Sequence, residues 1–176
     1  AKISAAAEIF YNGKKIKYNK RIMVPQNGEV TLVDNSSAEG YDAVIIKDYA
    51  LAVAETVNVE DKKLFFKDDT VFYRDENLNT KSVKSVLLDE EDDMLCKIYN
   101  SGGEACNIED VVAGMIVSVA ASVDFDVVEV RCSGESVSGE ITKVGKDKIT
   151  VGEKEYETAG SILNRDLIYA GANGIY

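Results

Sequence analysis

Two segments of this chain have similar sequences, and this internal similarity constrains the fold more than any other feature. Residues 41–66 (YDAVIIKDYALAVAETVNVEDKKLFF) and residues 125–151 (FDVVEVRCSGESVSGEITKVGKDKITV) both begin with an aromatic residue followed by Asp. Each continues with a short apolar stretch, a polar interruption and two stretches typical of a β-hairpin. One inserted residue near Gly139 aligns Leu64 with Ile149. Because the matched positions are strand and turn residues, the similarity predicts a repeated β unit and favours a scaffold over a single catalytic centre.

The rest of the sequence also shows short strand-like stretches separated by turns. Two β-prone runs flank Asn12 and Gly13, a pair that favours the type I′ turn of a tight hairpin. The best helical segment is residues 107–113, where Asn107 fits an N-cap and Gly114 fits a helix end, but it is only about two turns long. The sequence therefore predicts an all-β fold of antiparallel strands, arranged as two related small barrel-like or sandwich-like modules with one short helix.

The positions of the two similar segments predict a division of the chain into three regions. Residues 1–28 form an N-terminal hairpin region, residues 29–124 a first β module, and residues 125–176 a second β module. We expect the second module to be either incomplete at its end or completed by the N-terminal segment. The chain begins with Ala1 rather than Met, and we interpret it as a piece of a longer polypeptide.

Composition excludes several classes of function. The chain has 176 residues, of which 45% are hydrophobic, so it can form a packed core. It contains no His, which excludes Ser–His–Asp and Cys–His catalysis and His-ligated zinc within the chain. The net charge of −11 disfavours binding to nucleic acid and to anionic membranes. No apolar run approaches the roughly 18 residues that span a bilayer, so membrane insertion is not expected, and no signal peptide is visible.

The three cysteines, Cys96, Cys106 and Cys132, are not spaced as a metal-binding pair. Cys96 and Cys106 flank a predicted turn at residues 100–103, where a cross-strand disulfide could form in an exported protein. Three free thiols are the interpretation that we favour, because disulfide geometry is demanding. The sequence leaves the choice open.

One loop partly fits a calcium site. Within residues 34–42, the side chains of Asp34, Ser36 and Asp42 supply oxygen at intervals that resemble those of calcium loops. The dense Asp pattern of an EF-hand loop is missing, however, and a solvated turn fits the sequence better. We therefore expect no cofactor, and we keep these three residues as the calcium ligands to examine.

A second acidic segment is residues 89–93, DEEDD. Successive residues of a strand face opposite sides, so five consecutive carboxylates fit an exposed loop better than a metal site. A pair of carboxylates could hydrolyse a glycosidic bond if held in a cleft. With 31 acidic residues, sequence spacing identifies no such pair, and we assign no catalytic residue.

Positive charge is concentrated in one place, at Lys14, Lys15, Lys17, Lys20 and Arg21. These residues could bind an acidic polymer or the acidic remainder of a neighbouring copy. The more ordinary explanation is that lysines on an edge hairpin prevent aggregation between strands.

The C-terminal part of the chain carries motifs that resemble a known group of proteins. These motifs are residues 107–119 (NIEDVVAGMIVSV), a "V-x-G-x-I-x-x-V" series at Val137, Gly139, Ile141 and Val144, the segment KITV at residues 148–151, and Tyr156. They are similar to the β-repeat regions of clostridial and bacillar surface proteins that carry S-layer homology domains. The resemblance covers about residues 29–160, and its motifs mostly encode turns and alternation. The S-layer homology domains themselves are absent from this chain.

The resemblance implies an exported protein at the cell wall or S-layer and a non-catalytic, structural or spacer role. Its partners would be neighbouring domains of the same polypeptide, a cell-wall polymer or another surface protein. Three alternatives remain: a β module that binds wall polysaccharide or protein, a carboxylate-dependent hydrolase domain, and a phage virion or tail component. The sequence does not determine the ligand, the oligomeric state, or whether the origin is a bacterial surface or a phage.

Overall fold

The computed structural model groups the chain into two compact units, Ala1–Gly134 and Glu135–Tyr176, which are described separately. The described residues are 2–25, 27–35, 40–73, 75, 77–89, 94–133, 137–145, 148–157, 170–171 and 174–175. Among them, no helix has the length and apolar character needed to span a lipid bilayer.

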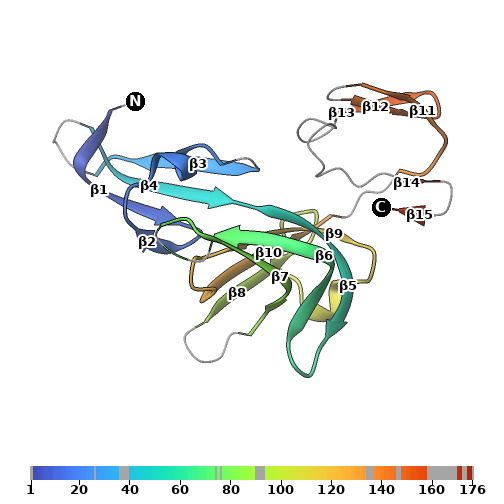
Figure 1. Ribbon diagram of the computed structural model, residues 1–176, viewed down its shortest axis with the longest axis horizontal. Helices are drawn as coiled ribbons and strands as arrows, with labels where there is room; N and C mark the ends of the chain where they lie inside the picture. The colour runs from blue at the N-terminus through green and yellow to red at the C-terminus, as the bar shows by residue number, and fades with distance from the viewer. Residues whose placement is uncertain are drawn as a thin grey trace. The chain divides into compact units, whose positions relative to one another are not determined.

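The described elements are almost all strands (Figure 1). In the first unit they are β1 (Ile3–Tyr11), β2 (Lys14–Ile16), β3 (Gly28–Val33), β4 (Tyr41–Asp48), β5 (Ala50–Asn58), β6 (Lys63–Tyr73), β7 (Thr80–Leu87), β8 (Leu95–Tyr99), β9 (Ile116–Ala121) and β10 (Val127–Cys132), with 3-10 turns η1 (Lys20–Met23) and η2 (Ile108–Asp110). In the second unit they are β11 (Ile141–Val144), β12 (Lys148–Val151), β13 (Lys154–Glu157), β14 (Ala170–Gly171) and β15 (Gly174–Ile175). The prediction of an all-β fold is confirmed.

The first sheet of the first unit has the strand order β2-β1-β4-β3. β1 and β2 form the predicted hairpin, with Asn12 and Gly13 both at positive φ, as a type I′ turn requires. β1 pairs with β4 in parallel, and β3 pairs with β4 in antiparallel orientation. The apolar side chains of this sheet form a core of their own around Ile22, Val44 and Ile46.

The second sheet of the first unit has the strand order β7-β6-β5-β9-β10-β8. All neighbours are antiparallel except β10 and β8. Its larger core is built around Leu64, Phe66, Val117, Val119 and Val130, each fully buried. Both sheets of this unit are open, and the described strands form no closed barrel.

The sheet of the second unit is small, with the order β11-β12-β13 in antiparallel pairs. Alternate residues Ile149 and Val151 are half-buried, and Tyr156 pairs with Ile149 across β12 and β13. The remaining described strands, β14 and β15, form a two-residue pair.

The helix predicted at residues 107–113 is shorter than expected and is reduced to the 3-10 turn η2. The carboxylate of Asp110 accepts a hydrogen bond from the Asn107 N–H at 2.8 Å, so the N-terminal cap forms as predicted. Val111, however, has an extended backbone and is buried in the larger core, that of the second sheet, here called the second core. The β-branched side chain of Val also has few χ1 rotamers in a helix, which lowers its helix propensity. Burial of Val111 in this core therefore ends the helix after one turn.

The structure gives no support for a repeated module. Residues 41–66 form β4, β5 and the start of β6, and residues 125–151 form β10, β11 and β12. β4 lies between β1 and β3, whereas β10 lies between β9 and β8 in the other sheet. The sequence alignment also matches Val144 with Val59. Val144 lies in β11 and pairs with Ile149, whereas Val59 lies beyond the end of β5. The similarity therefore reflects strand and turn composition.

The observed units also differ from the predicted division. β10 lies in the first unit rather than at the start of the second, and the N-terminal hairpin is part of the first unit as well. The reason is the long-range pairing of β10 with β9 and β8, which buries Val128 and Val130 in the second core.

Candidate functional site

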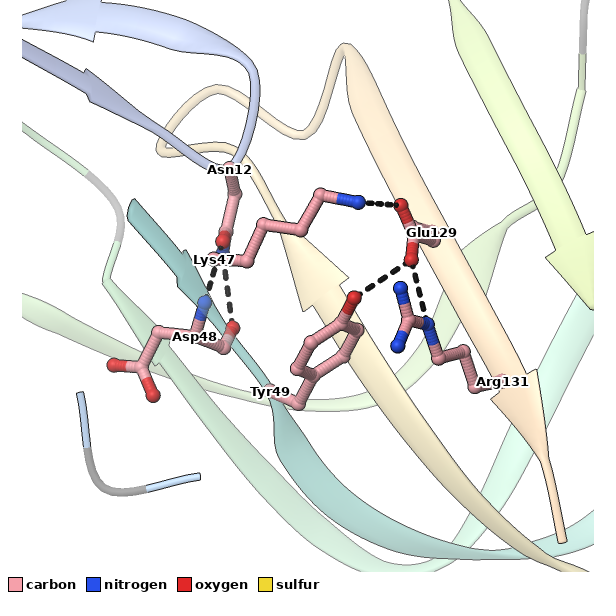
Figure 2. Close-up of polar contacts among 6 residues, drawn as sticks. All are labelled: Asn12, Lys47, Asp48, Tyr49, Glu129 and Arg131. Atoms are coloured by element: carbon pink, nitrogen blue, oxygen red, sulfur yellow. Dashed lines mark hydrogen bonds and ion pairs between the residues drawn. The ribbon is translucent and has the colours of Figure 1, made fainter. Parts of the chain in front are cut away.

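The most concentrated polar cluster of the described residues lies where the two sheets of the first unit meet. Tyr49 is the single residue between β4, which ends in the first sheet, and β5, which begins in the second (Figure 1). The polar groups of this junction, here called the joint, belong to Asn12, Lys47, Asp48, Tyr49, Glu129 and Arg131 (Figure 2).

Glu129 on β10 is the centre of the joint (Figure 2). One carboxylate oxygen accepts a hydrogen bond from Lys47 Nζ at 2.7 Å. The other accepts from the Tyr49 hydroxyl at 2.6 Å and from Arg131 Nε at 2.8 Å. The Arg131 guanidinium also lies 4.9 Å from the centre of the Tyr49 ring. Lys47 and Tyr49 come from the end of β4, so these contacts tie the first sheet to β10 of the second.

The surroundings of Glu129 keep its carboxylate ionised. Its side chain is only 14% exposed, and burial alone would raise its pKa. The hydrogen bonds from Lys47 and Tyr49 outweigh burial, so the pKa of Glu129 lies below its ordinary value. Burial and the bond to Glu129 raise the pKa of the Tyr49 hydroxyl, which therefore stays protonated and remains a donor.

Asn12 is the second part of the joint. It is buried, and its side-chain amide makes three hydrogen bonds to backbone groups. Nδ2 donates to the Asp48 carbonyl at 3.1 Å and to the Ala121 carbonyl at 2.8 Å, and Oδ1 accepts from the Asp48 N–H at 2.9 Å. Because Asp48 ends β4 and Ala121 ends β9, one side chain of the hairpin turn holds both sheets. Figure 2 shows its contacts with Asp48.

The rest of the hairpin turn also contacts the second sheet. Lys14 Nζ lies 2.7 Å from an Asp126 oxygen and 3.0 Å from an Asp124 oxygen. Burial would raise the pKa of Asp124, but the hydrogen bonds from Ser122 and Lys14 lower it to about 2. A Cβ at Gly13 would lie 2.9 Å from a methyl group of Val127, so only glycine lets the turn approach this closely.

The hydrogen bonds of the joint connect strands of the two sheets. No buried side-chain nitrogen or oxygen among the described residues lacks a hydrogen-bond partner. The pKa values of Asp124, Glu129 and Glu155 all lie below the ordinary carboxyl value, because each carboxylate accepts a hydrogen bond from a lysine.

The calcium-ligand candidates are only partly described. Asp42, at the start of β4, accepts a hydrogen bond from the Asn35 N–H at 2.9 Å, which closes the end of the loop. Asp34 lies at the other end of the loop, directly after β3. Ser36 lies outside the described residues. Within the described part of the chain, no group of three or more His, Cys, Asp or Glu side chains is placed to hold a metal ion.

The acidic segment at residues 89–93 is described only at its first residue. Asp89 accepts a hydrogen bond from Lys62 Nζ at 2.6 Å, which fastens the end of β7 to the turn between β5 and β6. Residues 90–93 lie outside the described part of the chain. The described portion of this segment is thus used in an ion pair.

The cysteines are free thiols, as the favoured interpretation expected, and the alternative disulfide between Cys96 and Cys106 does not form. The turn at residues 100–103 does exist, with the Gly103 N–H donating to the Asn100 carbonyl at 3.0 Å. Cys106, however, is in hydrogen-bond contact with Cys132. Cys96 and Cys132 are buried in the second core, and Cys106 packs against it.

These thiols are expected to react slowly in the folded protein. Burial raises the pKa of Cys132 to about 11, so about one molecule in a thousand carries its thiolate at pH 8. With an aromatic disulfide reagent and no reductant, we expect the native protein to react over hours and all three thiols to react at once in guanidinium. Detection of a single thiol in guanidinium would instead show that a disulfide exists.

The sequence did not single out Lys47, Tyr49, Glu129 or Arg131, and it identified Asn12 only as a turn residue. Glu129 and Arg131 alternate with buried valines on β10, which placed them on the other face of the sheet but gave no partner. Their partners are about 80 residues away, as with Tyr49 and Glu129. A pairing at that distance leaves no local signal in one sequence.

Comparison of the chain with protein-family models, with curated proteins and with solved structures finds no match.

Proposed function

We propose that this chain is a non-catalytic structural module, a spacer or interaction unit of a larger cell-surface polypeptide built from sandwich-like β modules. The observation that carries this proposal is the joint. Its polar side chains connect the two sheets by hydrogen bonds. We infer that these bonds hold the first unit rigid. The location at a cell surface rests on the resemblance to β-repeat regions of S-layer-homology proteins.

Rigidity at the joint is what a spacer requires. A module that sets a distance must not bend between its parts, yet only Tyr49 connects the two sheets at the β4–β5 junction. The Glu129 cluster and the Asn12 contacts lie on either side of this residue. Together they restrict the rotation that a one-residue connection would otherwise permit.

The proposal predicts that the two sheets open as one unit. In hydrogen–deuterium exchange under native conditions, amides in the first core, at Val44 and Ile46, should exchange with the same opening free energy as those in the second, at Val117 and Val119. Equal values that fall together in dilute denaturant support a rigid module. Exchange of the first sheet at a much lower free energy than the second would contradict it.

A binding module is the second candidate, because one aromatic side chain is presented to solvent. Among the described aromatic residues, Tyr18 stands out with 64% of its surface exposed, and Lys17, Lys20 and Arg21 lie close to it in sequence. An exposed aromatic ring beside positive charge suits recognition of an acidic partner. Co-sedimentation with purified Gram-positive cell walls separates the candidates, since a passive spacer stays in the supernatant and a wall-binding module does not.

A further inference from the structure

The outer edge of β1 is an open strand edge with an irregular backbone. Ile3 pairs with Tyr41, but Glu8 pairs with Ala43, so five steps along β1 correspond to two along β4. The register between the two strands therefore shifts by three residues, as at a large β-bulge. On its other flank, β2 covers only Ile9–Tyr11, so positions 3–8 have no strand partner there among the described residues.

Side-chain charge gives this edge little protection against pairing. Charged side chains and prolines are among the devices that shield natural edge strands, together with bulges such as the one here. Here Ser4, Ala5, Ala6 and Ala7 are small and uncharged, and the single charge, on Glu8, is engaged by Lys15. Ser4, Ala5 and Ala7 line a shallow hollow of about 470 Å³, together with Ile3, Ile9 and the exposed residue Tyr18. No described strand pairs with positions 3–8 on this flank, so another extended strand could pair there.

The charge around the edge indicates what the strand should carry. Residues 1–24 hold six basic residues and one acidic residue, a net charge of +5, whereas the remainder of the chain carries −16. Lys14 and Lys15 are engaged within the molecule. Lys20 and Arg21, which follow Tyr18 closely, are exposed and form no ion pair within the described part of the chain. An acidic strand edge is the complementary partner, and the rest of another copy offers one.

The opposite edge of the same sheet has the matching properties. β3 pairs only with β4, and its other flank has no described neighbour. β3 is six residues long, which equals the uncovered length of β1, positions 3–8. Its exposed residues include Glu29 and Thr31, and it leads directly to Asp34. Of the two edge strands of this sheet, β3 carries the acidic residue Glu29 and β2 carries no acidic residue.

We propose that the bulged edge of β1 binds the β3 edge of a second copy of this chain by strand addition. The two edges lie on opposite sides of one sheet. A pair of bound copies therefore still has a free β1 edge on one copy and a free β3 edge on the other. Such a contact is heterologous, and it extends into linear assemblies rather than closing as a symmetric dimer. This inference does not depend on the role proposed for the joint.

Sedimentation velocity and light scattering of the full chain test the proposal. At about 50 mM NaCl, we expect the average mass to rise with protein concentration above the monomer mass of 19.2 kDa, and the rise to be largely lost at about 500 mM NaCl. Two variants each place a lysine on one edge, Ala5→Lys on β1 and Thr31→Lys on β3, and a lysine opposes strand addition. Each variant alone should remain monomeric.

The decisive measurement mixes the two variants. Ala5→Lys retains a functional β3 edge and Thr31→Lys a functional β1 edge, so an equimolar mixture should form particles of twice the monomer mass and none larger. Ala113→Lys, at an exposed position outside the sheet edges, is the matched control and should assemble as the native chain does. Circular dichroism confirms that each variant is folded. A native chain that stays monomeric at low salt, or assembly that survives Ala5→Lys, would overturn the proposal.

Discussion

Replacement of Asn12 by Ala is expected to lower the free energy of unfolding of the first unit by about 3 kcal/mol. The substitution removes all three hydrogen bonds of a side chain that is only 5% exposed. It leaves the Ala121 carbonyl and the Asp48 N–H without this partner, and each buried group left unpaired costs about 1–3 kcal/mol. Asn12 also has φ of 44°, a region that Ala adopts less readily than Asn. Urea denaturation followed by far-ultraviolet circular dichroism measures the change.

Two further variants separate the contributions of Asn12. Asn12→Gly restores freedom at positive φ but not the hydrogen bonds, so it should recover at most about 1 kcal/mol of the loss. Asn12→Asp retains an acceptor for the Asp48 N–H but loses the donor to Ala121, and it should be destabilised nearly as much as the Ala variant. If Asn12→Gly were as stable as the native protein, the hairpin turn would matter only for its backbone conformation and the joint would not depend on it.

Replacement of Glu129 by Ala is expected to cost about 3 kcal/mol of the free energy of unfolding at pH 7. The loss has three sources, the first of which is the hydrogen bond of 2.8 Å from Arg131 Nε. Lys47, whose side chain is 35% exposed, loses its carboxylate partner, and the Tyr49 hydroxyl loses the acceptor at 2.6 Å. Denaturation by urea at pH 7 gives the value. The matched control is Glu8→Ala, which removes an ion pair with Lys15 in which both side chains are more than half exposed, and it should cost less than about 1 kcal/mol.

The stabilisation by Glu129 should also depend on pH in a defined direction. Its pKa is lower in the folded protein than in the unfolded chain, where it is about 4.5. The contribution is therefore fully present above about pH 4.5 and is lost as the pH falls through the folded pKa. Below that range, the stabilities of the native protein and of Glu129→Ala should converge. A difference that stayed constant from pH 7 down to pH 2 would show that packing, and not the charge of Glu129, is responsible.

Local patterns in the sequence were sufficient to predict the local structure. The hairpin at Asn12 and Gly13 forms as predicted, because the type I′ turn is specified by two adjacent residues. Asn107 likewise occupies the predicted N-cap position, because its contact with Asp110 spans only three residues. The length of the helix after it was not predictable, since it depends on whether Val111 is needed in a core made by distant strands.

Long-range pairing explains the errors. Similar strings of Val, Ile and Lys suggested a repeat, but these residues specify a strand without specifying its neighbours. The pairing of β5 with β9 joins Ala50 to Val119, and that of β10 with β8 joins Val128 to Cys96. Such partners decide which strands share a sheet, and a single sequence does not show them. The joint was missed for the same reason, because Lys47 and Glu129 are brought together only by this topology.

The position of β5 in its sheet has a consequence for how quickly the protein can fold. β5 forms a hairpin with β6, but its other neighbour, β9, begins only at Ile116. The second core therefore closes only after a loop of more than fifty residues has been brought together, which makes folding of this sheet intrinsically slow. During synthesis, the first sheet and the β5–β6 hairpin emerge before β9 and β10. Until those strands arrive, the newly made chain carries an unpaired apolar strand, and this is the interval in which a chaperone would help it most.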